Sequence, residues 1–418
     1  MASFPRVLVI SPVKFNLETG SGITMSNLFH GWPLDRIGQI YSENRTKPNL
    51  EACTHYFQLP YQNVRHASKT TMVTEMLRQT ASFITHRQQT LLGHFAHLDE
   101  LLPWVKHFNP DVIYARPLDR PSFSIWLPQW LSNKLSIPYI TRFLDDWPRR
   151  HEQDTVFLRR FFWRLFFKKR LTSLLTHAAQ NISISNEMSL AFQKRYQVSF
   201  THFHNCIDFN AWEPEKSDHS SNKPFRLVYL GSVKEDKELQ SLLDLKVSLL
   251  KLTEKGYEVQ LELFGPPVYK KTITEQLESH PVVKYGGFFP HHEKFKVLKQ
   301  ADLLVLPLNF DERSKNYLGY SFQTKVPEYM ASGTPTLVYG PTENPNVRYA
   351  SAYQWAAVVN RRDDDLLQHT LQRLIESHTW RQELGQRARK LALANHDANT
   401  IRPKFQQLIR EVVNKTAN

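Results

Sequence analysis

The residues best suited to chemistry lie in one short segment, in which Thr324, Lys325 and Glu328 precede Gly333. Pro327 favours the first turn of a helix and Gly333 is typical of a helix end, so this spacing predicts a helix that begins near Thr324. The Thr324 hydroxyl and the N–H groups at such an end suit a phosphate, and the Glu328 carboxylate can accept two hydrogen bonds from a diol. The plainer alternative is a capped helix whose acid is stabilised by the helix dipole.

A second cluster follows the apolar run Phe225–Leu230, where Gly231, Ser232 and Lys237 precede a segment of helical period. The run predicts a buried strand that ends at the glycine, and the loop then leads into the helix. A lysine beside a helix N-terminus suits a diphosphate, although most loop lysines are only solvated. The cluster is therefore a candidate diphosphate site.

A third cluster lies near the N-terminus, where Gly20, Ser21 and Gly22 separate an apolar run from a helical segment. Such a turn directs backbone N–H groups and the positive helix end toward an anion, typically a phosphate. Met25 stands where the dinucleotide fingerprint has its third glycine, so the binding of NAD or FAD is not supported. An ordinary strand-to-helix turn is an equal alternative.

Two neighbouring acids, Asp145 and Asp146, follow another apolar run. In an open parallel sheet, ligands bind at this end of the strands. Paired acids also suit a metal ion, but no further ligand lies at a useful spacing, and Arg142, Arg149 and Arg150 are close enough in sequence to neutralise them. We therefore expect no metal.

Short apolar, β-branched runs alternate with segments of helical period, which predicts parallel α/β architecture. The expected strands are Arg6–Ile10, Gly38–Tyr41, Asp111–Ala115, Pro138–Arg142, Asn181–Ser185, Phe225–Leu230, Glu258–Phe264, Val282–Tyr285, Asp302–Pro307, Pro335–Val338 and Ala356–Val359. Residues 211–224 contain two prolines, three serines and little to bury, so we expect a linker there. It would separate two doubly wound domains, 1–210 and 225–393, and a helix at 394–418 would pack back on the first domain.

The composition excludes several classes of protein. Of the 418 residues, 41% are hydrophobic, which is enough for two sizeable cores. Cys53 and Cys206 are far apart and lack metal-ligand spacing, so neither a disulfide framework nor a structural metal is implied. The N-terminus lacks a signal sequence, and no run approaches the ~18 apolar residues of a membrane span. We therefore expect a cytoplasmic protein.

The formal net charge of +13 permits nucleic acid, an anionic membrane surface or an anionic substrate as partner. Residues 156–171 interleave basic and aromatic side chains, which suits the headgroup region of an anionic leaflet. An equal alternative is that these aromatics pack on a core while the cations reach water. No nucleic-acid-binding signature accompanies the segment, so we expect no nucleic acid.

Taken in chain order, these motifs resemble a known family. The first motif is the N-terminal strand with its Gly loop at residues 20–22, and Asp-x-Trp-Pro follows. Next comes Tyr-x-Gly, with a lysine six residues past that Gly, and the last motif is Lys-x-x-Glu-Tyr-x-Ala-x-Gly-x-Pro. It resembles the family-4-like retaining glycosyltransferases of GT-B fold, over nearly the whole chain. The run from His204 to Asp208 is similar to that family's Pro-Asn-Gly-Ile-Asp segment, with His and Cys substituted. The fold that the resemblance implies is α/β, with two Rossmann-like doubly wound domains facing a central cleft.

The resemblance also implies an activity, which is sugar transfer from a nucleotide sugar held mainly by the C-terminal domain to an acceptor held mainly by the N-terminal domain. By position, Glu328 would bind the donor ribose and Lys237 the diphosphate. Residues 20–22 would contact the phosphate or the sugar, and Asp145 would face the reacting centre. Front-face attack with retention would need no metal or other cofactor, since cations and helix N-termini can stabilise the departing diphosphate.

Other side chains complete the expected donor site or depart from the family pattern. Phe289 is placed to lie on the nucleobase, and Ser321 and Thr324 to contact the sugar or a phosphate. Ser232 replaces the family arginine after the strand-end glycine, so Lys234, Lys325 or Arg116 would supply the second cation. Tyr320 replaces the acid expected eight residues before Glu328, which favours a less hydroxylated sugar.

The acceptor would be a glycan or a lipid-linked glycan in surface polysaccharide or glycolipid biosynthesis, at the inner face of the cell membrane if residues 156–171 touch it. One alternative is a non-catalytic nucleotide- or sugar-binding protein on the same scaffold, which Ser232 and Tyr320 motivate. Another is a different GT-B enzyme, such as an inverting transferase.

Overall fold

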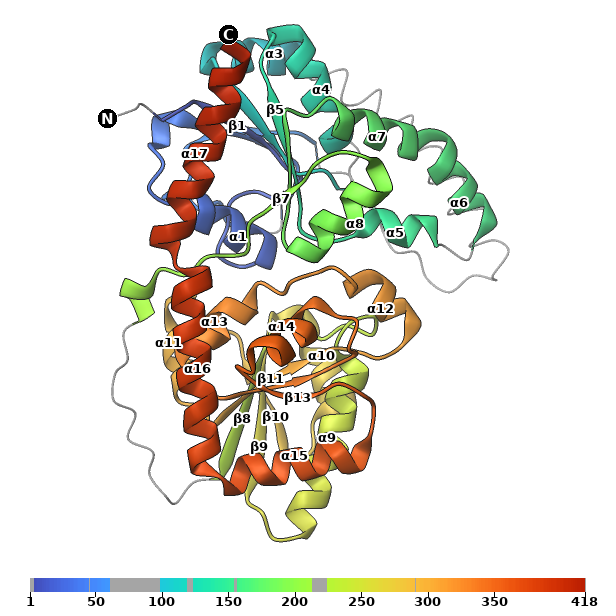
Figure 1. Cartoon of the computed structure of the whole chain (residues 1–418), viewed down its shortest axis with the longest axis vertical. Coiled ribbons are helices and arrows are strands. Elements are labelled where there is room, and N and C mark those ends of the chain that lie inside the picture. Colours follow the sequence, from blue (N-terminus) through green and yellow to red (C-terminus); the bar gives the residue numbers. More distant parts are fainter. Residues whose placement is uncertain are drawn as a thin grey trace. The chain divides into compact units, whose positions relative to one another are not determined.

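Figure 1 shows the chain as a computed structural model, which describes residues 4–44, 46–60, 98–118, 123–153, 156–212, 224–289 and 291–417. The chain divides into two compact units. The first contains Met1–Phe203 and Arg402–Asn418, and the second contains His204–Ile401. These limits replace the expected ones at residues 210 and 393, and the expected linker at 211–224 lies mostly outside the described residues.

The first unit contains a parallel sheet in the order β3-β2-β1-β4-β5-β6-β7. Its strands are β1 Val7–Ile10, β2 Ile37–Tyr41, β3 His55–Gln58, β4 Val112–Ala115, β5 Tyr139–Phe143, β6 Gln180–Ser183 and β7 Thr201–His202. Its helices are α1 Gly20–Phe29, α3 Leu98–Phe108, α4 Phe123–Leu135, α5 Trp147–Glu152, α6 Phe157–Phe162, α7 Lys169–Thr176 and α8 Asn186–Tyr196, with a π-helical turn at Trp163–Lys168. The strand order reverses between β1 and β4, which is where a doubly wound fold binds its ligands.

The last helix, α17 (Ala398–Ala417), begins in the second unit and ends in the first. Its Phe405 is fully buried and contacts the rings of Phe29, Tyr114 and Phe203 edge-on, with centroids 5.2 to 5.8 Å apart. Arg402 also donates from Nε to the carbonyl oxygen of Asn27 at 2.8 Å. The end of the chain is therefore part of the aromatic core of the first unit.

The second unit contains a parallel sheet in the order β10-β9-β8-β11-β12-β13. Its strands are β8 Phe225–Leu230, β9 Val259–Phe264, β10 Val283–Gly287, β11 Leu303–Pro307, β12 Thr336–Tyr339 and β13 Ala357–Val359. Its helices are α9 Leu239–Glu254, α10 Lys270–Thr272, α11 Lys294–Lys299, α12 Glu312–Leu318, α13 Lys325–Ser332, α14 Pro345–Tyr353, α15 Asp364–Glu376 and α16 His378–His396. Leucines of α9 and α15 share one core with the sheet, and α13 packs against α11 and α16 (Figure 1).

The α/β architecture with two doubly wound parallel sheets is confirmed, and each expected strand has a counterpart. Two edge strands were not expected. His55–Gln58 has polar residues at both ends and no buried position, and Thr201–His202 is short, polar and exposed, so neither contains the apolar run that reveals a buried strand. The helix predicted from Pro327 and Gly333 is α13, which ends at Gly333 with a left-handed φ of 69°.

Candidate active site

Helix α13 begins at Lys325, directly after Thr324, and places Glu328 in its first turn. The Thr324 side chain makes no capping hydrogen bond. Glu328 is 5% exposed, and its Oε1 accepts a hydrogen bond of 2.7 Å from Nζ of Lys294 on α11. A hydroxyl-bearing ligand at this carboxylate therefore meets both an acceptor and a cationic donor. Nothing in the sequence separates Lys294 from the other lysines of its segment, so the pairing was not predicted.

The Lys325 ammonium lies at the carboxyl end of β8. Its Nζ donates to the hydroxyl of Tyr229 at 3.0 Å and lies 4.2 Å from the centre of the Tyr229 ring. Gly231 has a φ of 149°, and a Cβ there would collide with this ammonium. Burial lowers the pKa of Lys325 to about 8, against the opposing effect of Glu238. A side chain larger than hydrogen at position 231 would thus displace the cation.

The loop from Gly231 to Glu238 is held against β11 by Asn309, just past the strand's end. The backbone N–H of Asn309 donates to the carbonyl oxygen of Lys237, and its Nδ2 donates to that of Glu235, both at 2.8 Å. The Tyr229 hydroxyl donates to the carbonyl oxygen of Ser232 at 2.6 Å. These bonds fix the loop backbone, and Ser232 and the half-buried Lys237 are thereby placed at the carboxyl edge of the sheet, where β8 and β11 mark its change of order.

A carboxylate that the sequence did not single out lies at the end of this loop. Glu238 is 3% exposed, and it precedes the first residue of α9. Burial raises the pKa of its carboxyl group, against the opposing effects of Lys325, Lys237 and Lys234. The loop therefore contains a buried acid among lysines.

Two asparagines at the start of α14 shape the loop that precedes α13. Asn346 donates from Nδ2 to the carbonyl oxygen of Ser321 at 3.0 Å and accepts from the N–H of Gln323 at 2.9 Å. Asn344 donates to the carbonyl oxygen of Leu318 at 3.1 Å. Ser321 is buried and Tyr320 is partly exposed.

Phe289 follows β10 and packs edge-on against Phe264 at the end of β9, with ring centroids 5.2 Å apart. Gly286 lies under the same Phe264 ring, where a Cβ would collide. Because β8, β9 and β10 are neighbouring parallel strands, this aromatic pair belongs to the same edge of the sheet as Gly231. Phe289 is half-buried, so part of its ring remains accessible.

In the first unit, residues 20–22 form the start of α1, as predicted. The Thr19 side chain accepts from the N–H of Gly22 at 3.2 Å, and the Asn16 side chain fills the space where a Cβ of Gly22 would lie. The buried Arg116, just after β4, donates from Nη2 to Oγ of Ser21 at 2.6 Å. Arg116 therefore contacts the N-terminal turn of α1 within the first unit.

The two acids after β5 have different environments. Asp146 is fully buried, caps α5 by accepting from the N–H of Arg149, and forms a two-bond ion pair of 2.8 Å with Arg195 of α8. The expectation that neighbouring arginines neutralise this acid was wrong, because the partner comes from a helix that is distant in sequence. Asp145 is half-buried at the carboxyl edge of the sheet.

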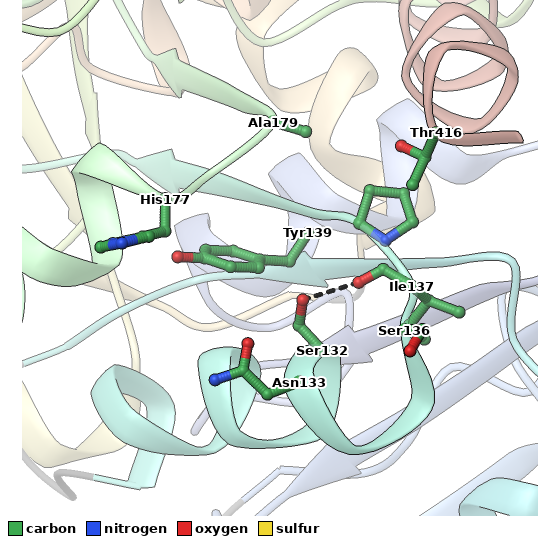
Figure 2. A pocket seen from close by; sticks show the side chains of 9 residues that line it. Ser132, Asn133, Ser136, Ile137, Tyr139, His177, Ala179 and Thr416 are labelled. Atoms are coloured by element: carbon green, nitrogen blue, oxygen red, sulfur yellow. Dashed lines mark hydrogen bonds between the residues drawn. The ribbon is translucent and has the colours of Figure 1, made fainter. Parts of the chain in front are cut away.

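A cavity of about 620 Å³ lies elsewhere in the first unit. Figure 2 shows that Tyr139 and His177 line it together with Ser132 of α4 and Thr416 of α17. Tyr139 is the first residue of β5, so this cavity is at the opposite edge of the sheet from Asp145. Its polar groups bond to the protein, since Ser132 donates to the carbonyl oxygen of Ile137 and Tyr139 to that of Leu174. It shares no residue with the predicted site.

Five of the predicted residues thus lie along the carboxyl edge of the second sheet, where the structure adds Lys294 and Glu238: Ser232, Lys237, Phe289, Lys325 and Glu328. Gly20, Ser21, Gly22 and Asp145 belong to the first unit. Among the described residues, no group of three or more His, Cys, Asp and Glu side chains could hold a metal ion.

Residues 211–391 match the family model described as glycosyl transferases group 1. The chain is a glycosyltransferase of GT-B fold. Such an enzyme transfers sugar from a nucleotide sugar. No curated protein sequence matches the chain significantly.

Solved structures share the fold of this glycosyltransferase over nearly its whole length. Sucrose-phosphate synthase from Thermosynechococcus elongatus is 14% identical, with a TM-score of 0.68 over 97% of this chain and 98% of its own. Anabaena HepE, in complex with UDP and glucose, is 13% identical, with a TM-score of 0.64 over 97% and 100%. WaaG, a glycosyltransferase involved in lipopolysaccharide biosynthesis, is 13% identical, with a TM-score of 0.59 over 96% and 99%.

Proposed function

We propose that the enzyme binds its nucleotide-sugar donor along the carboxyl edge of the second sheet. Glu328 accepts the hydroxyls of the ribose, Lys237 and Lys325 bind the diphosphate, and Phe289 lies against the base. The observation that carries this assignment is the placement of Lys325 and Glu328 on the first turn of one helix whose N-terminus meets the loop of Lys237. Helix N-termini and lysines favour phosphate, and a buried carboxylate favours a diol.

Lys325 supplies the second cation that the family pattern leads one to expect at position 232. Ser232 cannot carry a charge, but the Lys325 ammonium occupies the space beside Gly231, directly before Ser232. Its contact with Tyr229 holds it at the end of β8. The two lysines reach the diphosphate from α13 and from the loop before α9.

The same cations support a metal-independent reaction with retention of anomeric configuration. As the bond to the anomeric carbon breaks, negative charge develops on the departing diphosphate, and preorganised cations stabilise it. Asp145 of the first unit faces the reacting centre, and residues 20–22 contact the donor phosphate or sugar. Attack then takes place from the face that the diphosphate leaves.

The acceptor is a glycan or a lipid-linked glycan, and residues 156–171 bind an anionic membrane surface at the cytoplasmic face. Phe157, Phe161 and Leu165 are four residues apart and 66%, 47% and 46% exposed. Trp163, by contrast, is 3% exposed and stacks on His151 at 4.8 Å. The side chains of residues 162 and 166 lie outside the described set. The segment therefore packs on the unit through one face and presents apolar rings on another.

Charge supports this membrane assignment, because exposed Arg164, Lys168 and Lys169 accompany the apolar face. Each cation near an anionic leaflet contributes about 1 kcal/mol. In the described part of the chain, no helix has the length and hydrophobicity that crossing a bilayer requires. The fold similarity to WaaG agrees with an acceptor in surface polysaccharide or glycolipid biosynthesis.

Nucleotide binding and turnover test the donor site. Calorimetry with UDP, GDP, ADP, CDP and dTDP identifies the preferred base, and Glu328→Ala or Lys237→Ala should weaken its binding about ten- to a hundredfold. Glu312→Ala, at the exposed first residue of α12, is the matched control and should bind as the wild type does. Affinity unchanged in both site variants would remove these residues from the site. A protein that binds the nucleotide but neither hydrolyses nor transfers from any nucleotide sugar would be a binding protein instead.

Vesicle sedimentation tests the membrane assignment. The protein should sediment with anionic vesicles and be released by salt, since charge attraction is screened beyond about 8–10 Å. Replacing Phe157, Phe161 and Leu165 by serine should abolish the binding, whereas Leu190→Ser, at a position 60% exposed in the same unit, should not. Equal recovery with neutral and anionic vesicles would contradict the proposal.

A further inference from the structure

Glu238 has an unusual position for a buried acid, because it lies where the proposed donor places its diphosphate. The carboxylate is 3% exposed. Its hydrogen bonds within the protein are long: Ser232 Oγ lies 3.4 Å from both carboxylate oxygens, and the N–H of Lys234 lies 3.3 Å from Oε2. Strong hydrogen bonds to a carboxylate are about 2.5–2.9 Å long. The local hydrogen bonds therefore offset little of the free energy that burying this charge requires.

Lysines provide the stronger interaction with Glu238. Lys234 and Lys237 attract it from its own loop, and Lys325 attracts it from α13. The other titratable groups that face it are the hydroxyls of Tyr229 on β8 and of Tyr269 on the segment after β9, which are neutral.

Beyond these groups, Asp236 is another acid of the loop and acts on Tyr269, while Asn309 at the end of β11 is uncharged. Three cations thus surround one carboxylate. A net positive site remains for a ligand with two negative phosphates.

We propose that Glu238 is the counter-anion of the empty donor site and that the donor diphosphate takes over this role by driving Glu238 into its protonated form. The inference rests on the proposed function, because it needs the diphosphate at Lys237 and Lys325. When the diphosphate binds, its phosphates neutralise the same lysines, and a charged Glu238 would then face like charge in a buried site. Like charges at close range favour the protonated form of a carboxyl group.

The proton balance is simple. One proton passes from solvent to a carboxylate oxygen of Glu238 as the diphosphate binds, and no covalent bond of the ligand changes. The protonated acid can donate to a phosphate oxygen, which the carboxylate cannot do. In some range of pH, Glu238 is ionised in the free enzyme and protonated in the complex. Within this range the affinity for the donor falls as the pH rises.

Burial and the bound diphosphate act on Glu238 in the same direction. Burial raises the pKa of its carboxyl group in the free protein, and the negative phosphates favour the protonated form further. Lys325, whose pKa is about 8, gives a change of the same sign at higher pH. Lys325 is mostly protonated between pH 5.5 and 7, so affinity measured in this range reports on the titration of Glu238.

The experiment compares wild type with Glu238→Gln, using the best-binding of UDP, GDP, ADP, CDP and dTDP as probe. Glutamine keeps the shape and the acceptor oxygen but removes the charge. The variant should bind about tenfold more tightly at pH 7, because a like charge has been removed from the phosphate site. Affinity of the wild type relative to the variant should fall from pH 5.5 to pH 7, and titration of the probe itself cancels in this ratio.

Two further measurements sharpen the result. Calorimetry of the wild type in two buffers of different ionisation enthalpy should show a proton taken up on binding at pH 7, and this uptake should be smaller in Glu238→Gln. Glu235→Gln changes an exposed acid of the same loop and should leave affinity and proton uptake unchanged.

The outcomes separate the two proposals. If none of the five nucleotides binds the folded wild type, the proposed donor site fails. If one binds but the wild type takes up no more protons than Glu238→Gln, or if the variant binds equally or more weakly with the same pH dependence, Glu238 is only a structural acid of the loop and this inference alone is overturned. The difference in proton uptake between the wild type and the variant decides the matter, because the titration of the probe and of Lys325 cancels in it.

Discussion

The carboxyl edges of the two sheets carry positive charge in different ways. Along the second sheet the cations are lysines: Lys294 bonds to Glu328, and Lys325 bonds to the hydroxyl of Tyr229. Each makes its contact through a single ammonium on a flexible stem. Such a group can shift its pKa and exchange its partner for a ligand.

Along the first sheet the cations are arginines with fixed partners. Arg195 forms a two-bond pair with the buried Asp146, and Arg116 donates to Ser21 at the start of α1. The planar guanidinium sets both distance and orientation. The comparison indicates that the arginines of the first edge have fixed partners within the protein, whereas the lysines of the second edge make contacts that a ligand can replace. Two sheets of similar topology thus carry positive charge of two kinds.

Breaking the fixed pair of the first edge should have the largest effect. Arg195→Ala leaves the Asp146 carboxylate buried without its cation, which should lower the free energy of unfolding of the first unit by about 3–5 kcal/mol. Lys168→Ala is the matched control, because the Lys168 side chain is 48% exposed and its ion pair with Glu152 should contribute only about 0–1 kcal/mol. Urea denaturation measures both, and equal losses would show that the buried pair is not the structural element that we describe.

Changing a lysine of the second edge should weaken ligand binding and should leave the free energy of unfolding nearly unchanged. Lys325→Met removes the charge and should weaken nucleoside diphosphate binding about ten- to a hundredfold. Because the pKa of Lys325 is about 8, wild-type affinity should fall as the pH rises from 7 to 9, while Lys325→Arg, which stays charged, should lose this dependence. Lys296→Met, on the exposed side of α11, is the control. Calorimetry that finds the same pH dependence in Lys325→Arg would assign it to another group.

The smallest effect on binding is expected from a change of Tyr320, because this side chain is expected to contact only the sugar of the donor. Tyr320→Phe removes one hydroxyl from the position where the family acid would bind sugar hydroxyls, so affinity for the nucleotide sugar should change by about three- to tenfold. Affinity for the nucleoside diphosphate should stay the same. A thermal-shift screen of sugar variants on the preferred base tests this. A clear preference for a fully hydroxylated hexose such as glucose, unaffected by Tyr320→Phe, would contradict the role of Tyr320.

The sequence predicted those features whose signals are local. Pro327 and Gly333 mark the ends of α13 by their own backbone geometry, so the position of Glu328 on its first turn follows without tertiary information. Buried strands such as Val7–Ile10 contain unbroken apolar runs and were found for the same reason.

The remaining features depend on contacts between distant parts of the chain. Lys294 and Glu328, or Asp146 and Arg195, meet only because the sheets bring their helices together. Glu238 looks in sequence like one more acid in a charged loop, and only its burial reveals the counter-anion. A pattern along the chain contains no information about such pairs, since charged residues at these spacings are common on any surface.

Helix α17 has a consequence for how the protein is made. The second unit is one continuous stretch of chain, but the first needs Phe405, which lies beyond the whole of the second unit. During synthesis, Phe29, Tyr114 and Phe203 therefore cannot pack against Phe405 until the second unit has emerged from the ribosome. Units generally fold as they emerge, so the second can be complete before the first. A ribosome that stalls before residue 402 would release a chain with a formed donor domain and an unfinished aromatic core, which is a substrate for chaperones and proteases.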